Sequence, residues 1–220
     1  TGSLIGSGDI RISFMGPNGD ASYDGNSPDI AYDSWGNRYL VVWVANHHLD
    51  GQDINEFEVF MQFLDGVDGQ RLGDNIRISQ AGGGIGIPSR HARHPAIEFA
   101  QNRNEFMVIW RDDQTAGAGR SLVAQRISAE FGFEVGIDDA VLVPSGVVFD
   151  TDIAYSPVHS QYLVSATLNR DQDSDDVTYE SFMVRVNPDT TVAAAPVVVS
   201  NMRDQHNVGF SEAEYSTIAI

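Results

Sequence analysis

The chain has 220 residues, of which 42% are hydrophobic, and a formal net charge of −18 from 13 basic and 31 acidic residues. This hydrophobic content excludes a disordered chain, and no apolar run is long enough for a membrane-spanning helix. The negative charge repels nucleic-acid phosphates and anionic lipids, so we expect no nucleic-acid partner and no membrane insertion. The absence of cysteine excludes disulfides and thiolate chemistry.

Internal repeats dominate the chain. Two short apolar strands joined by a turn rich in Asn, Ser or Gly are typical of a β-hairpin. This pattern occurs at residues 28–43, 94–110 and 151–166, and a shorter copy occupies 207–220. The three longer copies align on an aromatic residue, which is Tyr32, Phe99 or Tyr155. The repeat therefore predicts a fold built from successive hairpins.

A second pair of apolar segments follows each of the longer hairpins. These segments lie at 59–64 and 76–79, at 122–127 and 141–143, and at 182–186 and 197–199. No segment shows the periodicity of an amphipathic helix. Units of four strands, repeated at about 50 residues, are typical of β-propeller blades. We therefore predict an all-β chain that forms a β-propeller of four-stranded antiparallel blades, at about 28–80, 95–145 and 151–200. A β-sandwich and a solenoid of hairpins are the alternatives.

The two ends of the chain look like parts of one further blade. Residues 9–13 repeat the pattern of 75–79, the last strand of the first unit, and the chain ends after the first two strands of a unit. We predict that 207–220 and 8–14 share a fourth blade in a single domain, 1–220. A third strand is missing from this blade. Either the blade is short, or another chain supplies a strand through self-association, or the chain is a piece of a larger ring.

The first candidate metal site is the loop Asn18-Gly-Asp20-Ala-Ser22-Tyr-Asp24. Its oxygen-bearing side chains are two residues apart, so a tight loop could direct them at one cation. Calcium prefers six to eight oxygen ligands and tolerates irregular geometry. The alternative is a turn that uses these side chains for its own hydrogen bonds.

Two further acidic loops have similar spacing. The stronger contains Asp171, Asp173 and Asp175, and the weaker covers residues 50–56. Each is a second-rank calcium candidate, with a solvated acidic loop as the alternative.

One basic cluster stands out in this acidic chain, and it consists of Arg90, His91, Arg93 and His94. Arginine forms bidentate contacts with carboxylates and sulfates, so the cluster is a candidate site for an anionic ligand. The alternative is that it compensates the surrounding acidic charge.

Catalytic residues are harder to assign. Paired carboxylates of the kind that hydrolyse glycosides are plentiful, but they are unspecific in a chain with 31 acidic residues. The first hairpin turn is only a partial match to the turn motif of sialidases. We therefore assign no catalytic residue and expect a protein that is not an enzyme.

Several segments of the first unit resemble a tandem repeat of large secreted bacterial surface proteins. They are Ile10-Arg-Ile-Ser-Phe-Met-Gly-Pro-Asn-Gly-Asp20, Pro28-Asp-Ile-Ala-Tyr32, Tyr39-Leu-Val-Val-Trp43 and Asn55-Glu-Phe-Glu-Val-Phe-Met-Gln62. The resemblance is close over 9–80 and fades in the later copies. Such repeats often accompany haemolysin-type calcium-binding and cadherin-like modules. The resemblance implies a propeller-like fold and an extracellular or cell-surface location.

Together these features predict an extracellular, calcium-stabilised binding or adhesion module that recognises a glycan or a surface protein. Two alternatives remain open. One is a structural assembly subunit that is completed by strand exchange with another chain. The other is a propeller-type, glycan-cleaving enzyme.

Overall fold

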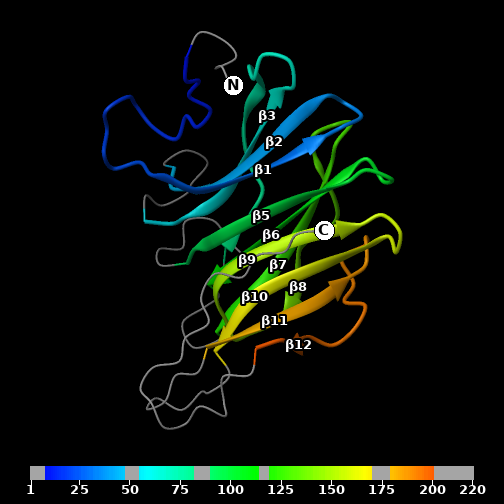
Figure 1. Ribbon diagram of the computed structural model, residues 1–220. Helices are drawn as coiled ribbons and strands as arrows, with labels where there is room; N and C mark the ends of the chain where they lie inside the picture. The colour runs from blue at the N-terminus through cyan, green and yellow to red at the C-terminus, as the bar shows by residue number, and fades with distance from the viewer. Residues whose placement is uncertain (1–7, 48–54, 82–89, 114–118, 170–178, 201–220) are drawn as a thin grey trace, which may run out of the picture.

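The computed structural model describes residues 8–47, 55–81, 90–113, 119–169 and 179–200, and these contain three four-stranded antiparallel sheets (Figure 1). In each sheet the strands pair in chain order. The described residues contain no α-helix, and so none that could cross a membrane. The prediction of an all-β fold made of four-stranded antiparallel blades is confirmed.

Each sheet is one blade. Blade 1 consists of β1 (Gly25–Asp33), β2 (Arg38–Ala45), β3 (Glu58–Asp65) and β4 (Arg71–Arg77). Blade 2 consists of β5 (Ala92–Ala100), β6 (Glu105–Asp113), β7 (Arg120–Ser128) and β8 (Glu134–Val143). Blade 3 consists of β9 (Val147–Ser156), β10 (Gln161–Asn169), β11 (Tyr179–Val186) and β12 (Val197–Val198).

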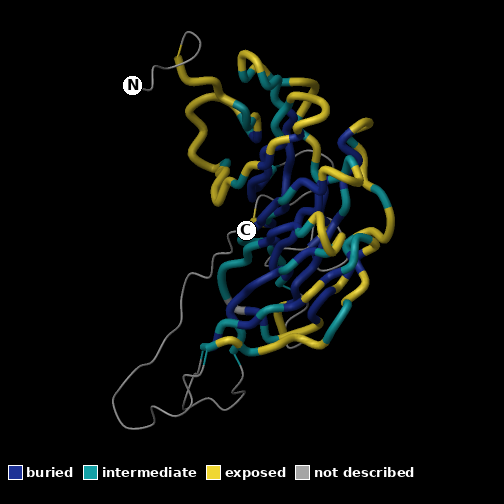
Figure 2. Tube along the Cα trace, turned by 45° about the vertical axis from the view of Figure 1, so that its right-hand side comes forward, coloured by how far each residue is buried: buried dark blue, intermediate teal, exposed yellow. Residues whose placement is uncertain are grey.

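The blades stack face to face, and the core lies between them (Figures 1 and 2). Successive strand residues point to opposite faces, so blade 2 supplies side chains to both of its neighbours. Trp110 packs in the cluster shared with blade 1, whereas Ile109 packs in the cluster shared with blade 3. Both residues are fully buried. This double burial explains the nearly continuous apolar run in β6.

The aromatic residues that align the repeats form one cross-strand pair in each blade. Tyr32 pairs with Tyr39 and Phe99 pairs with Phe106, with ring centroids 5.0 and 4.9 Å apart. The equivalent pair in blade 3 joins Tyr155 to residue 162 at 4.7 Å. Such contacts stabilise the first hairpin of each blade beyond the area that they bury.

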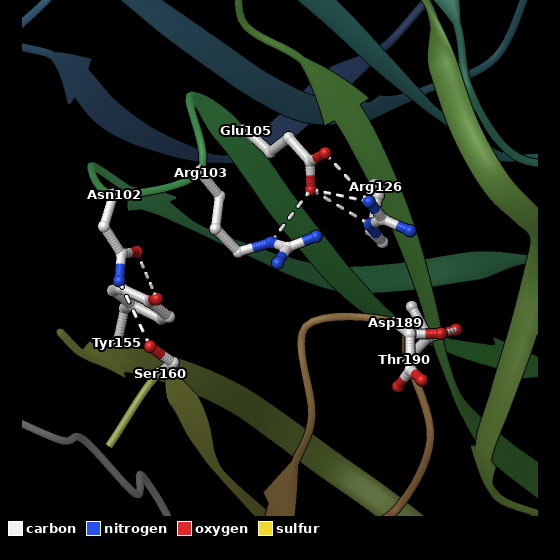
Figure 3. Close-up of polar contacts among 8 residues, drawn as sticks. All are labelled: Asn102, Arg103, Glu105, Arg126, Tyr155, Ser160, Asp189 and Thr190. Carbon is white, nitrogen blue, oxygen red and sulfur yellow. Dashed lines mark hydrogen bonds and ion pairs between the residues drawn. The ribbon is translucent and has the colours of Figure 1, made fainter. Parts of the chain in front are cut away.

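Polar contacts tie blade 2 to blade 3 at the hairpin end (Figure 3). The Asn102 side chain donates to the hydroxyl of Ser160 at 3.2 Å and accepts a hydrogen bond from the hydroxyl of Tyr155. Asn102 lies in the β5–β6 turn, whereas its two partners belong to the first hairpin of blade 3. The contacts therefore hold the first hairpins of the two blades together.

The N-terminal segment 8–24 covers the outer face of blade 1. Met15 packs there against Trp43 and Phe60. No strand forms over residues 8–14. The Asn75 side chain on β4 instead binds the backbone of this segment, accepting from Phe14 N and donating to the carbonyl of residue 12, both at 2.8 Å. The other half of the expected shared blade, 207–220, lies outside the described residues, so the shared blade stays a prediction.

Candidate active site

The starts of the first strands of the three blades come together, because β5 packs against both β1 and β9. Three short segments line a pocket at this place: residues 27–29, 94–96 and 150–152. We call it the strand-start pocket. Each segment occupies the same place in its repeat, so the pocket is built from equivalent positions of the three blades.

Each segment carries the same backbone irregularity. Ser27, His94 and Asp150 have positive φ values of 52°, 51° and 21°, and the strand pairing shifts register at each of them. None of the three is glycine, so each positive φ costs conformational energy. Bulges of this kind redirect side chains and are common beside active sites. Their recurrence at one pocket marks it as a candidate site.

Two aspartates point to the pocket from equivalent positions of blades 1 and 3. Asp29 Oδ2 accepts a hydrogen bond from the backbone N–H of Ile97 at 2.9 Å, and its Oδ1 accepts one from Ile30 at 2.8 Å. Asp152 Oδ1 accepts one from Ile153 at 2.9 Å. Backbone donors therefore hold both carboxylates in defined orientations.

Glu98 lines a second pocket toward the hairpin end of the same strands, and the charges of both aspartates act on it. Burial, together with smaller contributions from the negative charges of Asp29 and Asp152, raises the pKa of Glu98 to about 7. Burial also raises the pKa of Asp29. Near neutral pH, a substantial fraction of Glu98 therefore carries a proton. The three carboxyl groups can thus combine a proton donor with ionised oxygens.

A histidine and a third carboxylate also line the strand-start pocket. His94 Nδ1 lies 3.3 Å from Asp150 Oδ1. The backbone carbonyl of His94 accepts a hydrogen bond from the Thr151 hydroxyl, which joins blade 2 to blade 3. Burial lowers the pKa of His94, so its imidazole is neutral at pH 7. A neutral imidazole beside a carboxylate can accept or relay a proton.

The structure places the predicted calcium loop away from this pocket. Asn18, Asp20, Ser22 and Asp24 are all exposed. Asn18 accepts from Arg11, and Asp20 Oδ1 accepts from the backbone of Ser22 at 3.0 Å, so these oxygens serve local contacts of the loop. The described residues contain no group of three acidic or histidine side chains that could hold a metal ion. Calcium at this loop stays an untested prediction.

The other sequence-based candidates have different outcomes. Asp171, Asp173 and Asp175 lie outside the described residues, as do residues 50–54. In the basic cluster, His94 alone lines the strand-start pocket. His91 Nδ1 accepts from the backbone of Phe57 at 3.3 Å, Arg93 pairs with Asp113, and Arg90 is half-buried.

Sequence reasoning missed Asp29, Glu98 and Asp152, although the repeats held a signal for them. Asp29 and Asp152 share one repeat position. Glu98 stands where the other two copies have alanine, so it is the residue that departs from an otherwise apolar consensus. A glutamate in place of alanine on a half-buried inner strand costs folding free energy, so its presence at position 98 indicates a function.

Solved structures that resemble this fold include two carbohydrate-active enzymes. An N-acetylgalactosamine deacetylase from F. plautii, solved with blood group B trisaccharide, has a TM-score of 0.50 and 15% identity over 79% of this chain. A thermostable family-43 glycoside hydrolase has a TM-score of 0.50 and 13% identity over 80% of this chain. The chain spans 52% and 58% of their lengths. No known protein family matches the sequence, and no curated protein does.

The expectation that the protein is not an enzyme is contradicted by this comparison, because the two similar structures described above are enzymes. In a chain with 31 acidic residues, the carboxylates alone had identified no catalytic residue. At such low identity the likeness itself establishes the propeller fold. An activity for this chain has to be argued from its own residues.

Proposed function

We propose that this chain carries the catalytic carboxyl groups of a glycan-cleaving enzyme that acts outside the cell. The observation that carries the proposal is Glu98, a pocket-lining carboxyl group with a pKa of about 7 on which the charges of Asp29 and Asp152 act. Glycoside hydrolysis commonly needs one protonated and one ionised carboxyl group at the scissile bond. The strained backbone at the neighbouring strand starts supports a functional reading of the same place.

The hydrogen bonds suggest different roles for the two aspartates. Both oxygens of Asp29 accept backbone N–H groups, and one of these bonds joins two blades. Asp29 is therefore assigned a positioning role, and its charge adds to the burial that raises the pKa of Glu98. Asp152 is assigned as the base.

In a single displacement, Glu98 donates its proton to the glycosidic oxygen as the bond from this oxygen to the anomeric carbon breaks. A water molecule attacks the anomeric carbon, and its proton passes to the carboxylate of Asp152. The products are two shorter glycans. A proton transfer from Asp152 to Glu98 through solvent restores the starting state.

The substrate class is a polysaccharide. The fold supports this proposal, because the similar structures include a glycoside hydrolase and an enzyme solved with a trisaccharide. The extracellular location is part of the proposal, and it agrees with the resemblance of the first unit to secreted surface repeats.

The test is the release of reducing ends from a panel of soluble polysaccharides by the purified chain. We expect Glu98→Gln to reduce the rate by about 100-fold or more, because general acid catalysis commonly contributes that much. The matched control is Glu130→Gln, which changes an exposed glutamate far from the inner strands. Release of reducing ends by the wild type that survives Glu98→Gln would refute the proposal, as would no release from any substrate.

A further inference from the structure

A cluster of arginines lies beside the strand-start pocket. Among the described residues, three arginines surround one carboxylate, that of Asp113. The nitrogen–oxygen distances are 3.4 Å from Arg93, 3.1 Å from Arg111 and 3.3 Å from Arg120. This concentration of positive charge occurs in a chain whose net charge is −18.

The arrangement is electrostatically expensive. Arg93 of β5 and Arg111 of β6 are directly opposite in the antiparallel register, and like charges in this position repel. Arg111 is 4% exposed, and burial lowers the pKa of its guanidinium, with a further contribution from the charges of Arg120 and Arg93. Neutral residues at these positions would avoid the repulsion between the arginines. We therefore infer that the cluster has a function.

The cluster is both close to the pocket and accessible. Arg93 directly precedes His94, which lines the strand-start pocket, and the charges of Arg111 and Arg93 help to lower the pKa of His94. The Arg93 and Arg120 side chains are 39% and 48% exposed. Both guanidinium groups are therefore accessible to a ligand from solvent.

We propose that Arg93 and Arg120, supported by the buried Arg111, form a subsite that binds the carboxylate of a uronic acid in the substrate. The inference rests on the proposed function and adds to it an acidic polysaccharide as the substrate. Guanidinium groups bind planar carboxylates in a bidentate geometry, and the carboxylate of Asp113 already occupies the centre of the cluster. A neutral sugar would gain nothing from this charge.

The test measures binding of trigalacturonate and of its methyl ester, which differ in charge and little in shape. We expect the wild type to bind the acid at least about tenfold more tightly than the ester, since charged hydrogen bonds contribute that much. Arg93→Gln and Arg120→Gln should each remove most of this preference. Arg185→Gln is the matched control, because it removes an exposed arginine from β11. Added inorganic sulfate should compete with trigalacturonate.

Equal binding of acid and ester by the wild type would overturn the subsite, and so would failure of both probes to bind. Retention of the preference in both arginine variants would also overturn it. The binding measurements are repeated with the Glu98→Gln variant, in which the arginine subsite stays intact. If Glu98→Gln is fully active while the acid preference holds, only the proposed function fails. If Glu98→Gln is inactive while acid and ester bind equally, only the subsite fails.

Discussion

The carboxylate of Asp29 in β1 accepts a hydrogen bond from the backbone N–H of Ile97 in β5, with 2.9 Å between Oδ2 and N. This contact joins blades 1 and 2 one residue before Glu98. The same carboxylate contributes to the raised pKa of Glu98 through its negative charge. Asp29 thus links the packing of the blades to the protonation of the candidate active site.

Removing the Asp29 side chain should therefore destabilise the fold. We expect Asp29→Ala to lower the free energy of unfolding by about 1–3 kcal/mol, because a half-buried backbone donor loses its partner. Asp29→Asn retains an acceptor oxygen and should lose less. Urea denaturation of the two variants measures the difference. An equal loss in both would show that the hydrogen bond to Ile97 is not the source.

Glu98 should make the stability of the protein depend on pH. Its pKa is about 7 in the folded chain, above the ordinary value of 4.5. Its contribution is therefore fully present below pH 4.5 and is lost as the pH rises from about 4.5 to 7, because the unfolded chain releases its proton first. Denaturation at several pH values should show a smaller decline for Glu98→Gln than for the wild type across this window. Parallel curves would contradict the assignment.

Glu58 should produce a second decline at higher pH. The Ser79 hydroxyl donates to Glu58 Oε2, and the backbone of Ala81 donates to Oε1 at 2.9 Å. Burial raises the pKa of Glu58 to about 9, with a smaller contribution from Glu56. The stability contributed by the protonated group is therefore lost as the pH rises from 4.5 to 9. The difference between the melting temperatures at pH 6 and pH 9 should therefore be smaller in Glu58→Gln than in the wild type. If the variant retains the full difference, Glu58 is not responsible.

Asn46 should stabilise the N-terminal loop. This residue is 4% exposed, its Nδ2 donates to the carbonyl of Ser22 at 2.8 Å, and its Oδ1 accepts from the backbone of Asp24 at 2.6 Å. We expect Asn46→Ala to cost about 1–3 kcal/mol, because two part-buried hydrogen bonds from this side chain to the backbone are lost. Asn18→Ala, on the exposed side of the same loop, is the control. Equal unfolding midpoints for the two variants would argue against this role.

The blades could be predicted from the sequence because their physics is local. Apolar alternation, turn residues and the repeated aromatic pair of Tyr32 and Tyr39 together specify hairpins that recur along the chain. The course of the N-terminus could not be predicted in this way. Residues 9–13 look like a strand, but Ile12 and Phe14 hydrogen-bond to the side chain of Asn75 rather than to a strand backbone.

The candidate site depended on packing between blades. The strand-start pocket, and the influence of Asp29 and Asp152 on Glu98, arise only when β1, β5 and β9 come together. Composition could not identify Glu98 and Asp29, because the chain has 31 acidic residues. The departure of Glu98 from the alanine of the other copies was the signal that the sequence did contain.

The most direct test of the central claim compares two leaving groups in Glu98→Gln. A polysaccharide needs protonation of its leaving oxygen, whereas a nitrophenyl glycoside of the same sugar leaves without it. If Glu98 is the general acid, Glu98→Gln should lose about 100-fold or more in rate on the polysaccharide and far less on the nitrophenyl glycoside. Equal losses on both substrates, or no loss on either, would contradict the assignment of Glu98 as the acid.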